Sequence, residues 1–225
     1  MTVDIAVPAP ASSANVAPDI AAGEIDFIDL LAERGWCVVD DFLAPIRVGE
    51  LRASLLERWG NEEFRQAGVG RGEQRQLRTE VRTDHVRWLD PDSVSNAEAH
   101  YLGRMETLRG EVNRALFLGL FDFEAHLAMY PPGTFYRKHL DQFLGIGTRT
   151  LSAVLYLNED WGPADGGQLR IYTDAANPDH YEEVEPLAGR LVLFLSARFL
   201  HEVMPARRER MSVTGWFRTR ENGFG

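Results

Sequence analysis

Short segments with alternating polar and apolar residues fill the chain after Phe121, and they limit its fold more than any other feature. Five of them are expected to be strands, over residues 123–130, 148–157, 168–172, 191–196 and 210–217. Turn-forming residues such as Pro131-Pro132-Gly133 and Asp165-Gly166-Gly167 separate them. Many short strands joined by such turns are typical of a closed or double sheet. We therefore predict a mainly β core with a jelly-roll, cupin-like architecture, a double-stranded β-helix.

The residues before this core predict supporting helices, because apolar residues recur at helix spacing and glycine or proline marks the ends. In chain order we expect a helix from Glu24 to Gly35, a strand over 36–39, a helix from Pro45 to Gly60 and a helix over 96–118. Residues 61–80 are polar and weakly periodic, which predicts a long mobile loop. An alternating strand over 81–89 follows it.

Composition bounds the class of protein. The chain has 225 residues, enough for one substantial domain but few for two. We expect a disordered Ala-, Pro- and Ser-rich tail over 1–22, a flank over 23–120 and a β core over 121–220, the last two forming one α+β domain. A net charge of −10 argues against a nucleic-acid surface, and no run approaches a membrane span. With Cys37 the only cysteine and no secretory signal, we expect a cytoplasmic monomer.

Three residues have the chemistry of a metal site. His139 and Asp141 are two residues apart, which on a strand places both side chains on one face. His201 begins a later short segment, from which a facing strand could bring a third ligand. Two histidines and one carboxylate make the facial triad of non-haem Fe(II) oxygenases, which leaves positions on the ion for an oxo-acid and O₂. The spacing alone fits two surface histidines equally well.

Arg210 adds a second chemical feature. It begins an alternating segment, and three later residues share its face: Ser212, Thr214 and Trp216. A guanidinium beside small hydroxyls on an inward face suits a carboxylate, because its planar fork can bind both oxygens. An exposed arginine on a strand edge is the alternative. We predict that Arg210 binds a carboxylate, with Arg149 and Arg170 as the next candidates.

The order of these residues resembles the Fe(II)- and 2-oxoglutarate-dependent dioxygenases. The surrounding sequence is most similar to the Egl-nine type prolyl hydroxylases, which include the animal oxygen sensors and their bacterial relatives. The matching stretches are Met129-Tyr130-Pro131, Tyr136 to Asp141, Tyr156 to Trp161, Gly166 to Ile171, His201 to Pro205 and Arg210 to Trp216. Each motif is weak alone, but their common order argues against chance.

The resemblance implies a role for each matching residue. Fe(II) would be held by His139, Asp141 and His201, and the far carboxylate of 2-oxoglutarate would pair with Arg210 and Tyr156. Four further residues would contact this cosubstrate, Tyr130 and Trp216 as pocket walls and Thr214 and Ser152 through hydroxyls. Five residues would contact the substrate: Arg82, Asp84, Trp88, Tyr136 and Arg149. In the family a flexible loop closes over the peptide in this region, and the alternative here is a plain surface loop followed by an edge strand.

The implied activity is hydroxylation of a prolyl residue in a partner protein. It would be coupled to the conversion of 2-oxoglutarate and O₂ to succinate and CO₂, with ascorbate as a reductant. For bacterial relatives the implied target is a translation factor such as elongation factor Tu. Because Asp141 is present, the resemblance favours hydroxylation over halogenation. Two alternatives stay open: hydroxylation of a small free amino acid or metabolite, and a non-catalytic cupin-like module that holds a metal.

Overall fold

The structure is a computed structural model and describes residues 27–68, 76–142, 147–177 and 179–220. The predicted disordered tail and the first residues of the predicted helix from Glu24 lie outside this part of the chain. So does the middle of the predicted loop over 61–80. Within the described ranges no helix is long and apolar enough to cross a membrane.

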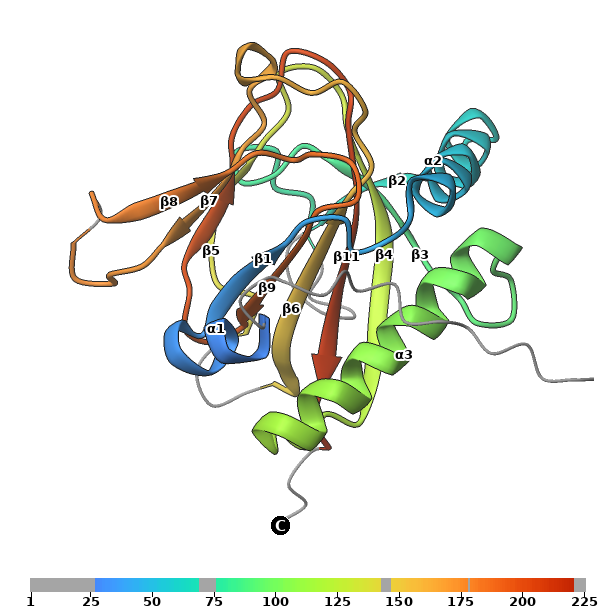
Figure 1. Cartoon of the computed structure of the whole chain (residues 1–225). Coiled ribbons are helices and arrows are strands. Elements are labelled where there is room, and N and C mark those ends of the chain that lie inside the picture. Colours follow the sequence, from blue (N-terminus) through green and yellow to red (C-terminus); the bar gives the residue numbers. More distant parts are fainter. Residues whose placement is uncertain (1–26, 69–75, 143–146, 178, 221–225) are drawn as a thin grey trace, which may run out of the picture.

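The described chain forms eleven strands in two antiparallel sheets (Figure 1). In chain order they are β1 Trp36–Val39, β2 Arg65–Gln66, β3 His85–Trp88, β4 Asp122–Tyr130, β5 Tyr136–His139, β6 Arg149–Tyr156, β7 Leu169–Tyr172, β8 Tyr181–Val184, β9 Leu191–Leu195, β10 His201–Val203 and β11 Arg210–Arg218. The large sheet has the order β1-β9-β6-β11-β4-β3-β2, and the small sheet has the order β5-β10-β7-β8. This is a double-stranded β-helix, so the predicted fold class is confirmed.

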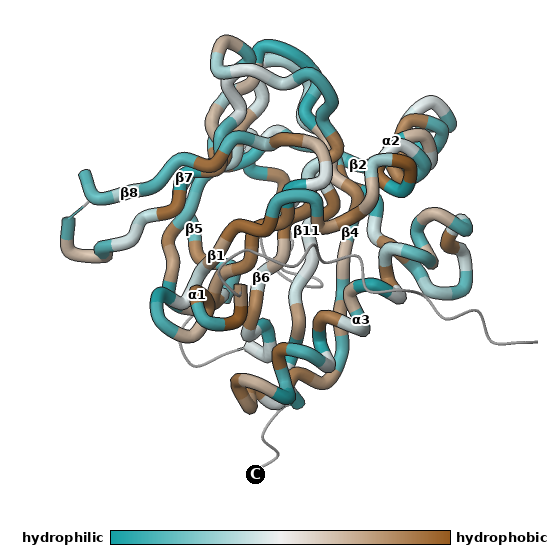
Figure 2. Tube along the Cα trace, in the orientation of Figure 1, coloured by the Kyte–Doolittle hydropathy of each residue, from teal (hydrophilic) through white to brown (hydrophobic). Residues whose placement is uncertain are grey.

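The large sheet is buried on both faces because its central strands are apolar on both. Met211, Val213 and Phe217 of β11 join a hydrophobic cluster on the helix side. The neighbouring cluster between the two sheets contains Tyr156 of β6 and Phe194 of β9. Figure 2 shows hydrophobic residues gathered along these central strands. The interior between the sheets is thus where inward-facing polar residues such as Arg210 become buried.

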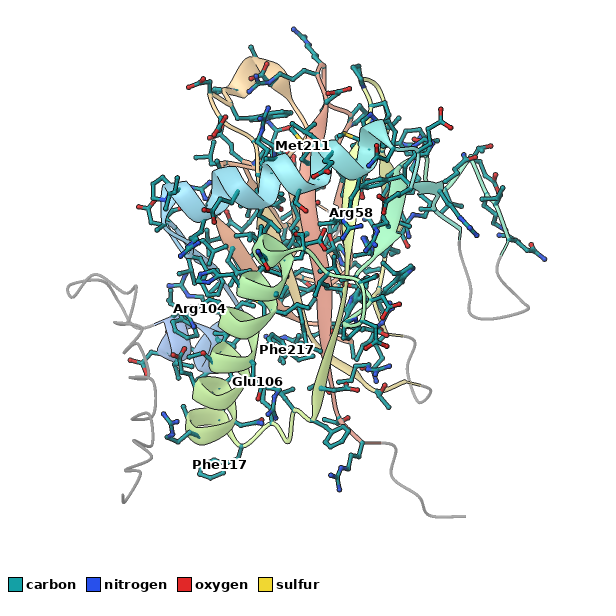
Figure 3. The ribbon with its side chains drawn as sticks, turned by 90° about the vertical axis from the view of Figure 1, so that its right-hand side faces the viewer. Arg58, Arg104, Glu106, Phe117, Met211 and Phe217 are labelled. Carbon is teal, nitrogen blue, oxygen red and sulfur yellow. The ribbon has the colours of Figure 1, made fainter. Side chains whose placement is uncertain are left out.

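Three helices lie outside this sheet: α1 Phe27–Arg34, α2 Pro45–Gly60 and α3 Asn96–Leu116. Figure 3 shows α2 and α3 crossing the outer face of the large sheet. A capping box begins α3, in which Ser95 accepts from the Glu98 backbone N–H and the Glu98 side chain accepts from the Ser95 N–H. The fully buried Glu98 also binds Arg58 of α2 at 2.6 Å and so ties the two helices together. The predicted division at residue 120 stays a prediction.

Several predicted boundaries differ from the structure. The strand expected over 81–89 is confined to β3, and the short β2 pairs with it inside the region predicted as loop. No strand was predicted for β8, whose exposed Glu182 and Glu183 hide any apolar alternation. Most important for the site, β5 ends at His139, so Asp141 lies beyond the strand and does not share its face by strand geometry.

Candidate metal and oxo-acid site

The two predicted metal-binding histidines come together by strand pairing. His201 on β10 is the direct antiparallel partner of His139 on β5, and the ladder is irregular just beyond this pair. Paired residues on adjacent strands have neighbouring side chains, and the two imidazole rings lie with their centroids 4.1 Å apart. The third ligand therefore comes from the neighbouring strand of the same small sheet.

Asp141 reaches the histidines from the irregular segment after β5. Its Oδ1 lies 3.7 Å from His139 Nε2, and its Oδ2 lies 3.6 Å from His201 Nε2. The Ser152 hydroxyl donates to Asp141 Oδ2 at 2.6 Å, and Ser196 Oγ lies 2.9 Å from Ser152 Oγ. An ionised carboxylate only accepts hydrogen bonds, so the Ser152 proton points at Asp141 and Ser196 donates to Ser152. Ser152 of β6, supported by Ser196 just after β9, thus holds a carboxylate that lies outside any strand.

Backbone carbonyls orient both imidazoles. His139 Nδ1 lies 2.7 Å from the Arg137 carbonyl oxygen, and His201 Nδ1 lies 3.1 Å from the Phe199 carbonyl oxygen. A carbonyl can only accept, so each Nδ1 carries the proton and each Nε2 keeps its lone pair for a metal. Burial and the neighbouring His139 lower the pKa of His201 to about 4, which keeps this imidazole neutral near pH 7.

The acid of the group is ionised. Burial alone would raise the pKa of Asp141, but His201, His139 and the Ser152 hydroxyl outweigh it and hold the pKa well below its usual value. The ligand atoms of the three residues all lie within 4.8 Å of one another. Two imidazoles and one carboxylate form a donor set that suits a divalent cation. The three residues fit the Fe(II) site that their order in the chain predicts.

Arg210 lies at the other end of the interior and is only 1% exposed. Its Nε donates to the Gly167 carbonyl oxygen at 2.8 Å, whereas its buried Nη2 has no hydrogen-bond partner among the described residues. No carboxylate of the described chain forms an ion pair with it. A buried charge without a counter-charge is costly. The guanidinium therefore has the features of an anion-binding site.

Two tyrosines flank this guanidinium. The centroids of the Tyr130 and Tyr156 rings each lie 5.0 Å from the Arg210 guanidinium carbon. The Tyr156 hydroxyl is buried without a hydrogen-bond partner in the described chain, as is the Ser212 hydroxyl. Burial raises the pKa of Tyr156 to about 12 although Arg210 opposes it, so the phenol stays a neutral donor. These groups fit the distal carboxylate of an oxo-acid.

The other two arginines considered for this anchor are already paired. Arg149 donates through Nε to Glu124 at 2.7 Å and stacks on Trp216, 3.6 Å from the ring centroid. Arg170 binds Glu183 at 2.7 Å on the outer side of the small sheet. Neither has the unpartnered, buried guanidinium of Arg210, so Arg210 is the anchor that the structure favours.

The predicted substrate residues fall into two groups. At one edge of the interior, Arg149 stacks on Trp216, whose ring centroid lies 6.0 Å from that of the half-exposed Trp88. The Trp216 indole N–H is buried and unpartnered in the described chain. Arg82, Asp84 and Tyr136 instead contact one another beside His139 and are treated below. Thr214 lies half-buried on β11, in register with His126 and Val154, and its predicted role stays a prediction.

Some residues of the site were not predicted. Ser196 supports Ser152, and His126 packs against Trp88 with ring centroids 5.1 Å apart. Both lie far in sequence from their contacts, so no local spacing marks them. Ser152 was predicted to offer its hydroxyl to the oxo-acid, whereas in the structure that hydroxyl binds Asp141.

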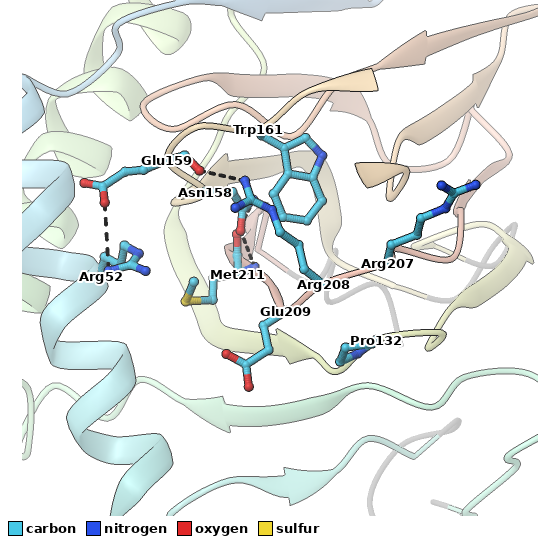
Figure 4. Close-up of a pocket in the computed structure, with 9 residues that line it drawn as sticks. All are labelled: Arg52, Pro132, Asn158, Glu159, Trp161, Arg207, Arg208, Glu209 and Met211. Carbon is cyan, nitrogen blue, oxygen red and sulfur yellow. Dashed lines mark hydrogen bonds and ion pairs between the residues drawn. The ribbon is translucent and has the colours of Figure 1, made fainter. Parts of the chain in front are cut away.

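A separate surface pocket of about 360 Å³ lies between α2 and the loops that follow β6 and precede β11 (Figure 4). It contains none of the predicted site residues. Arg208 stacks on Trp161 and donates to the carbonyl oxygens of Glu159 and Asp160, and Arg52 lies 3.9 Å from the Glu159 carboxylate. The pocket is therefore separate from the triad and from Arg210.

Known proteins match the part of the chain that carries these residues. Residues 125–218 match the 2OG-Fe(II) oxygenase superfamily. Over 208 residues the chain is 30% identical to a hypoxia-inducible factor prolyl hydroxylase of Caenorhabditis elegans. The match covers 83% of this chain and 27% of that protein. The chain is 28% identical to Egl nine homolog 1 of Homo sapiens, covering 84% of this chain and 45% of that protein. The chain thus spans half or less of the length of these two relatives.

Two solved structures match more completely. A Pseudomonas putida prolyl-4-hydroxylase superposes with a TM-score of 0.75 at 46% identity, covering 86% of this chain and 97% of that one. A Trichoplax adhaerens prolyl hydroxylase, solved with a hypoxia inducible factor peptide fragment, superposes with a TM-score of 0.75 at 26% identity, covering 85% and 87%. On the family match over residues 125–218 and the 46% identity over nearly all of the Pseudomonas structure, the chain belongs to the 2OG-Fe(II) oxygenase superfamily and, within it, to the prolyl hydroxylases related to Egl nine.

Proposed function

We propose that this chain hydroxylates a prolyl residue in a partner protein, with Fe(II), 2-oxoglutarate and O₂. The observation that carries the proposal is Arg210, a buried guanidinium with an unpartnered Nη2 in the same interior as a triad of metal-ligand type. A cupin-like module that only holds a metal has no need of this unpaired cation. When bound, the ion and the oxo-acid supply O₂ activation coupled to decarboxylation.

The chain's own residues would bind, orient and exclude water. His139, Asp141 and His201 would hold the ion by Nε2 and carboxylate oxygens, with the Nδ1 protons fixed by backbone carbonyls. Arg210 and the neutral Tyr156 phenol would take the distal carboxylate of 2-oxoglutarate. Along β6, Ser152 and Tyr156 are four residues apart, about 13 Å of strand, which separates the acid's anchor from the metal carboxylate. The buried interior keeps water away from both.

The substrate would enter at the aromatic edge next to the triad. Trp216 is the cross-strand partner of Ser152, the residue that holds Asp141. Trp88 is 45% exposed there and lies beside Trp216, with ring centroids 6.0 Å apart. The flat faces of Trp88 and Trp216 suit the ring of a proline, and the unpartnered Trp216 N–H could donate to a peptide carbonyl. We propose a protein loop as substrate, in a cytoplasmic setting, with a translation factor as first candidate.

A free amino acid or small metabolite is the rival substrate. The test is to incubate the protein, purified without metal, with Fe(II), 2-oxoglutarate and either a cell lysate or a panel of free amino acids. Succinate release shows the oxygenase reaction, and mass spectrometry then looks for a gain of one oxygen atom on a prolyl residue of a protein. Oxygen gained only by a free amino acid would replace the proposed substrate. No succinate under any condition would favour a non-catalytic module.

A further inference from the structure

Four side chains form a column that runs from the segment before β3 to the metal site. The buried Asp84 binds Arg82 through two parallel bonds, Nε to Oδ1 at 2.8 Å and Nη2 to Oδ2 at 2.6 Å. The Arg82 guanidinium carbon lies 4.1 Å from the centre of the Tyr136 ring. The Tyr136 ring in turn stacks on the His139 imidazole, with centroids 3.5 Å apart and planes 16° apart. His139 is the metal-site end of this column.

The backbone holds the two sides of the column in register. Arg82 forms a β-bridge with Tyr136, and the Arg137 N–H donates to the Val81 carbonyl oxygen at 2.8 Å. The Thr83 N–H donates to the Phe135 carbonyl oxygen at 3.1 Å. Residues 81–84 therefore lie along β5 as an additional short strand-like segment. The side-chain stack follows from a fixed backbone alignment.

The exposure of these groups argues against direct contact with a substrate. Asp84 is 0% exposed, and the Arg82 fork is committed to it by both bonds. Breaking such a buried pair leaves an uncompensated charge, which is strongly unfavourable. What the pair does present is a flat cation against one face of Tyr136, whose other neighbour is the imidazole. A guanidinium over the face of a tyrosine ring is attracted to it, and the other face of the Tyr136 ring covers the imidazole of His139.

We propose that Asp84, Arg82 and Tyr136 act as positioning residues for His139, so that the segment before β3 is coupled to the metal site. The Arg137 carbonyl oxygen fixes His139 at Nδ1, and the Tyr136 ring fixes the plane of the imidazole. Together they fix the direction in which the Nε2 lone pair of His139 points. The inference rests on the metal site of the proposed function. It assigns Arg82 and Asp84 a role through His139 in place of the substrate contact predicted from sequence.

The test uses Co(II) alone as a probe, without oxo-acid or peptide. Co(II) affinity and its visible absorption spectrum are measured by titrating the full chain, for the parent and for Arg82→Ala, Arg82→Lys and Arg87→Ala. Arg82 reaches His139 only through the Tyr136 ring, so Arg82→Ala should weaken Co(II) binding by no more than loss of that ring does, about 2- to 13-fold, with an altered spectrum. Arg82→Lys should fall between, because it keeps the charge and loses the fork. Arg87→Ala is the matched control, since Arg87 pairs with Glu63 near the same segment but touches no residue of the column.

Tyr136 gives a second arm in case Arg82→Ala does not fold. Tyr136→Phe keeps the stacked ring and should bind Co(II) like the parent, whereas Tyr136→Leu removes it and should weaken binding by about 2- to 13-fold. Parent-like Co(II) affinity and spectrum in both Arg82→Ala and Tyr136→Leu would overturn the inference, and loss of peptide turnover alone would then restore the substrate contact. A parent protein that binds no Co(II) would instead overturn the metal site itself.

Discussion

The metal ligands and the oxo-acid anchor share one interior but are prepared in opposite ways. Every ligand of the triad has its second group already bonded: His139 and His201 to backbone carbonyls, Asp141 to Ser152. At the Arg210 end, the guanidinium Nη2 and the Tyr156 hydroxyl are buried with no partner in the described chain. The metal end is satisfied and oriented, and the anchor end is left unsatisfied.

The difference follows from what each end has to bind. A metal ion needs lone pairs at fixed directions, so the surrounding bonds serve to orient ligands that the ion then completes. A carboxylate is itself a strong acceptor, so it needs donors that no protein group has taken. Unsatisfied buried donors cost stability in the free protein, and the ligand that satisfies them recovers that cost. The predictions below test this contrast.

The largest effect is expected from the triad itself. His201→Ala or Asp141→Ala removes one of three protein bonds to the ion, and even changes behind such ligands cost about 10- to 100-fold. Fe(II)-dependent conversion of 2-oxoglutarate to succinate should therefore fall more than 100-fold, toward background. The measurement is succinate formation together with metal content after dialysis. Near-parent turnover in a folded His201→Ala protein would show that the triad is wrongly assigned.

Arg210 should separate binding from stability. Losing a charge-assisted pair from a desolvated pocket costs roughly 2–5 kcal/mol, or about 30- to 5,000-fold in affinity. Arg210→Ala should weaken 2-oxoglutarate binding by that amount, and Arg210→Lys should weaken it less because it keeps the charge and loses the fork. Co(II) binding should survive in both, as measured by separate titrations.

Arg210 also tests whether its unpaired, buried guanidinium lowers the stability of the free protein. Arg210→Met replaces an unpaired buried cation by an apolar chain of similar length, a change that is often neutral or stabilising. The free energy of unfolding without ligand should therefore not fall, and added 2-oxoglutarate should raise the melting temperature of the parent but not of this variant. A large loss of stability in Arg210→Met would mean that the guanidinium is already satisfied in the free protein.

A smaller effect is expected behind the metal carboxylate. Ser152→Ala removes the hydroxyl that donates to Asp141 and should weaken Co(II) binding by about 10- to 100-fold. Thr150→Val is the matched control, because Thr150 lies on the same face of β6 and its hydroxyl donates to the Thr148 carbonyl oxygen and not to the triad. Equal effects of the two changes would make Ser152 a packing residue only.

The smallest effect is the pH dependence of stability that arises from His126, which packs against Trp88 at the aromatic edge. Burial and the charge of Arg82 lower the pKa of His126 to about 4, below its ordinary value of 6.5. As pH falls from 6.5 toward 4 the unfolded chain takes up this proton first, so stability falls through that window and levels off below it. Between pH 7.5 and pH 5.5 the parent should lose about 1 kcal/mol more than His126→Gln. Parallel pH curves for the two proteins, from denaturant unfolding, would contradict a buried neutral imidazole.

The fold and most of the site could be predicted because they leave local signals. β4, β6 and β11 are long alternating segments, and the turns between strands carry proline and glycine. It could be predicted that His201 joins His139 from another strand. That the two residues pair directly could not, because the sequence between them does not specify which strands become neighbours. Arg210 was identified from its inward face and hydroxyl neighbours, and the structure adds that its buried Nη2 has no hydrogen-bond partner in the described chain.

What could not be predicted depends on contacts between distant segments. Asp141 looked like a strand neighbour of His139, but β5 ends first and Ser152 holds the carboxylate instead. Arg82 and Asp84 were predicted to lie on a strand over 81–89 and to contact the substrate, and only the fold reveals that they are bonded to each other and that Arg82 stacks on Tyr136. Spacing along the chain describes one strand face at a time. It does not predict contacts with a hydroxyl group or an aromatic ring of another strand.

The order of strands in the large sheet also determines when each strand can pair during synthesis. β1 (Trp36–Val39) lies at one edge of this sheet and pairs with β9 (Leu191–Leu195). The partner is therefore synthesised about 150 residues later, which at roughly 5–20 residues per second is a wait of about 8–30 s. Throughout that interval the growing chain carries an apolar strand without its hydrogen-bonding neighbour. The edge strand that is made first therefore finds its partner late in synthesis, and until then its unpaired backbone groups could pair with another chain.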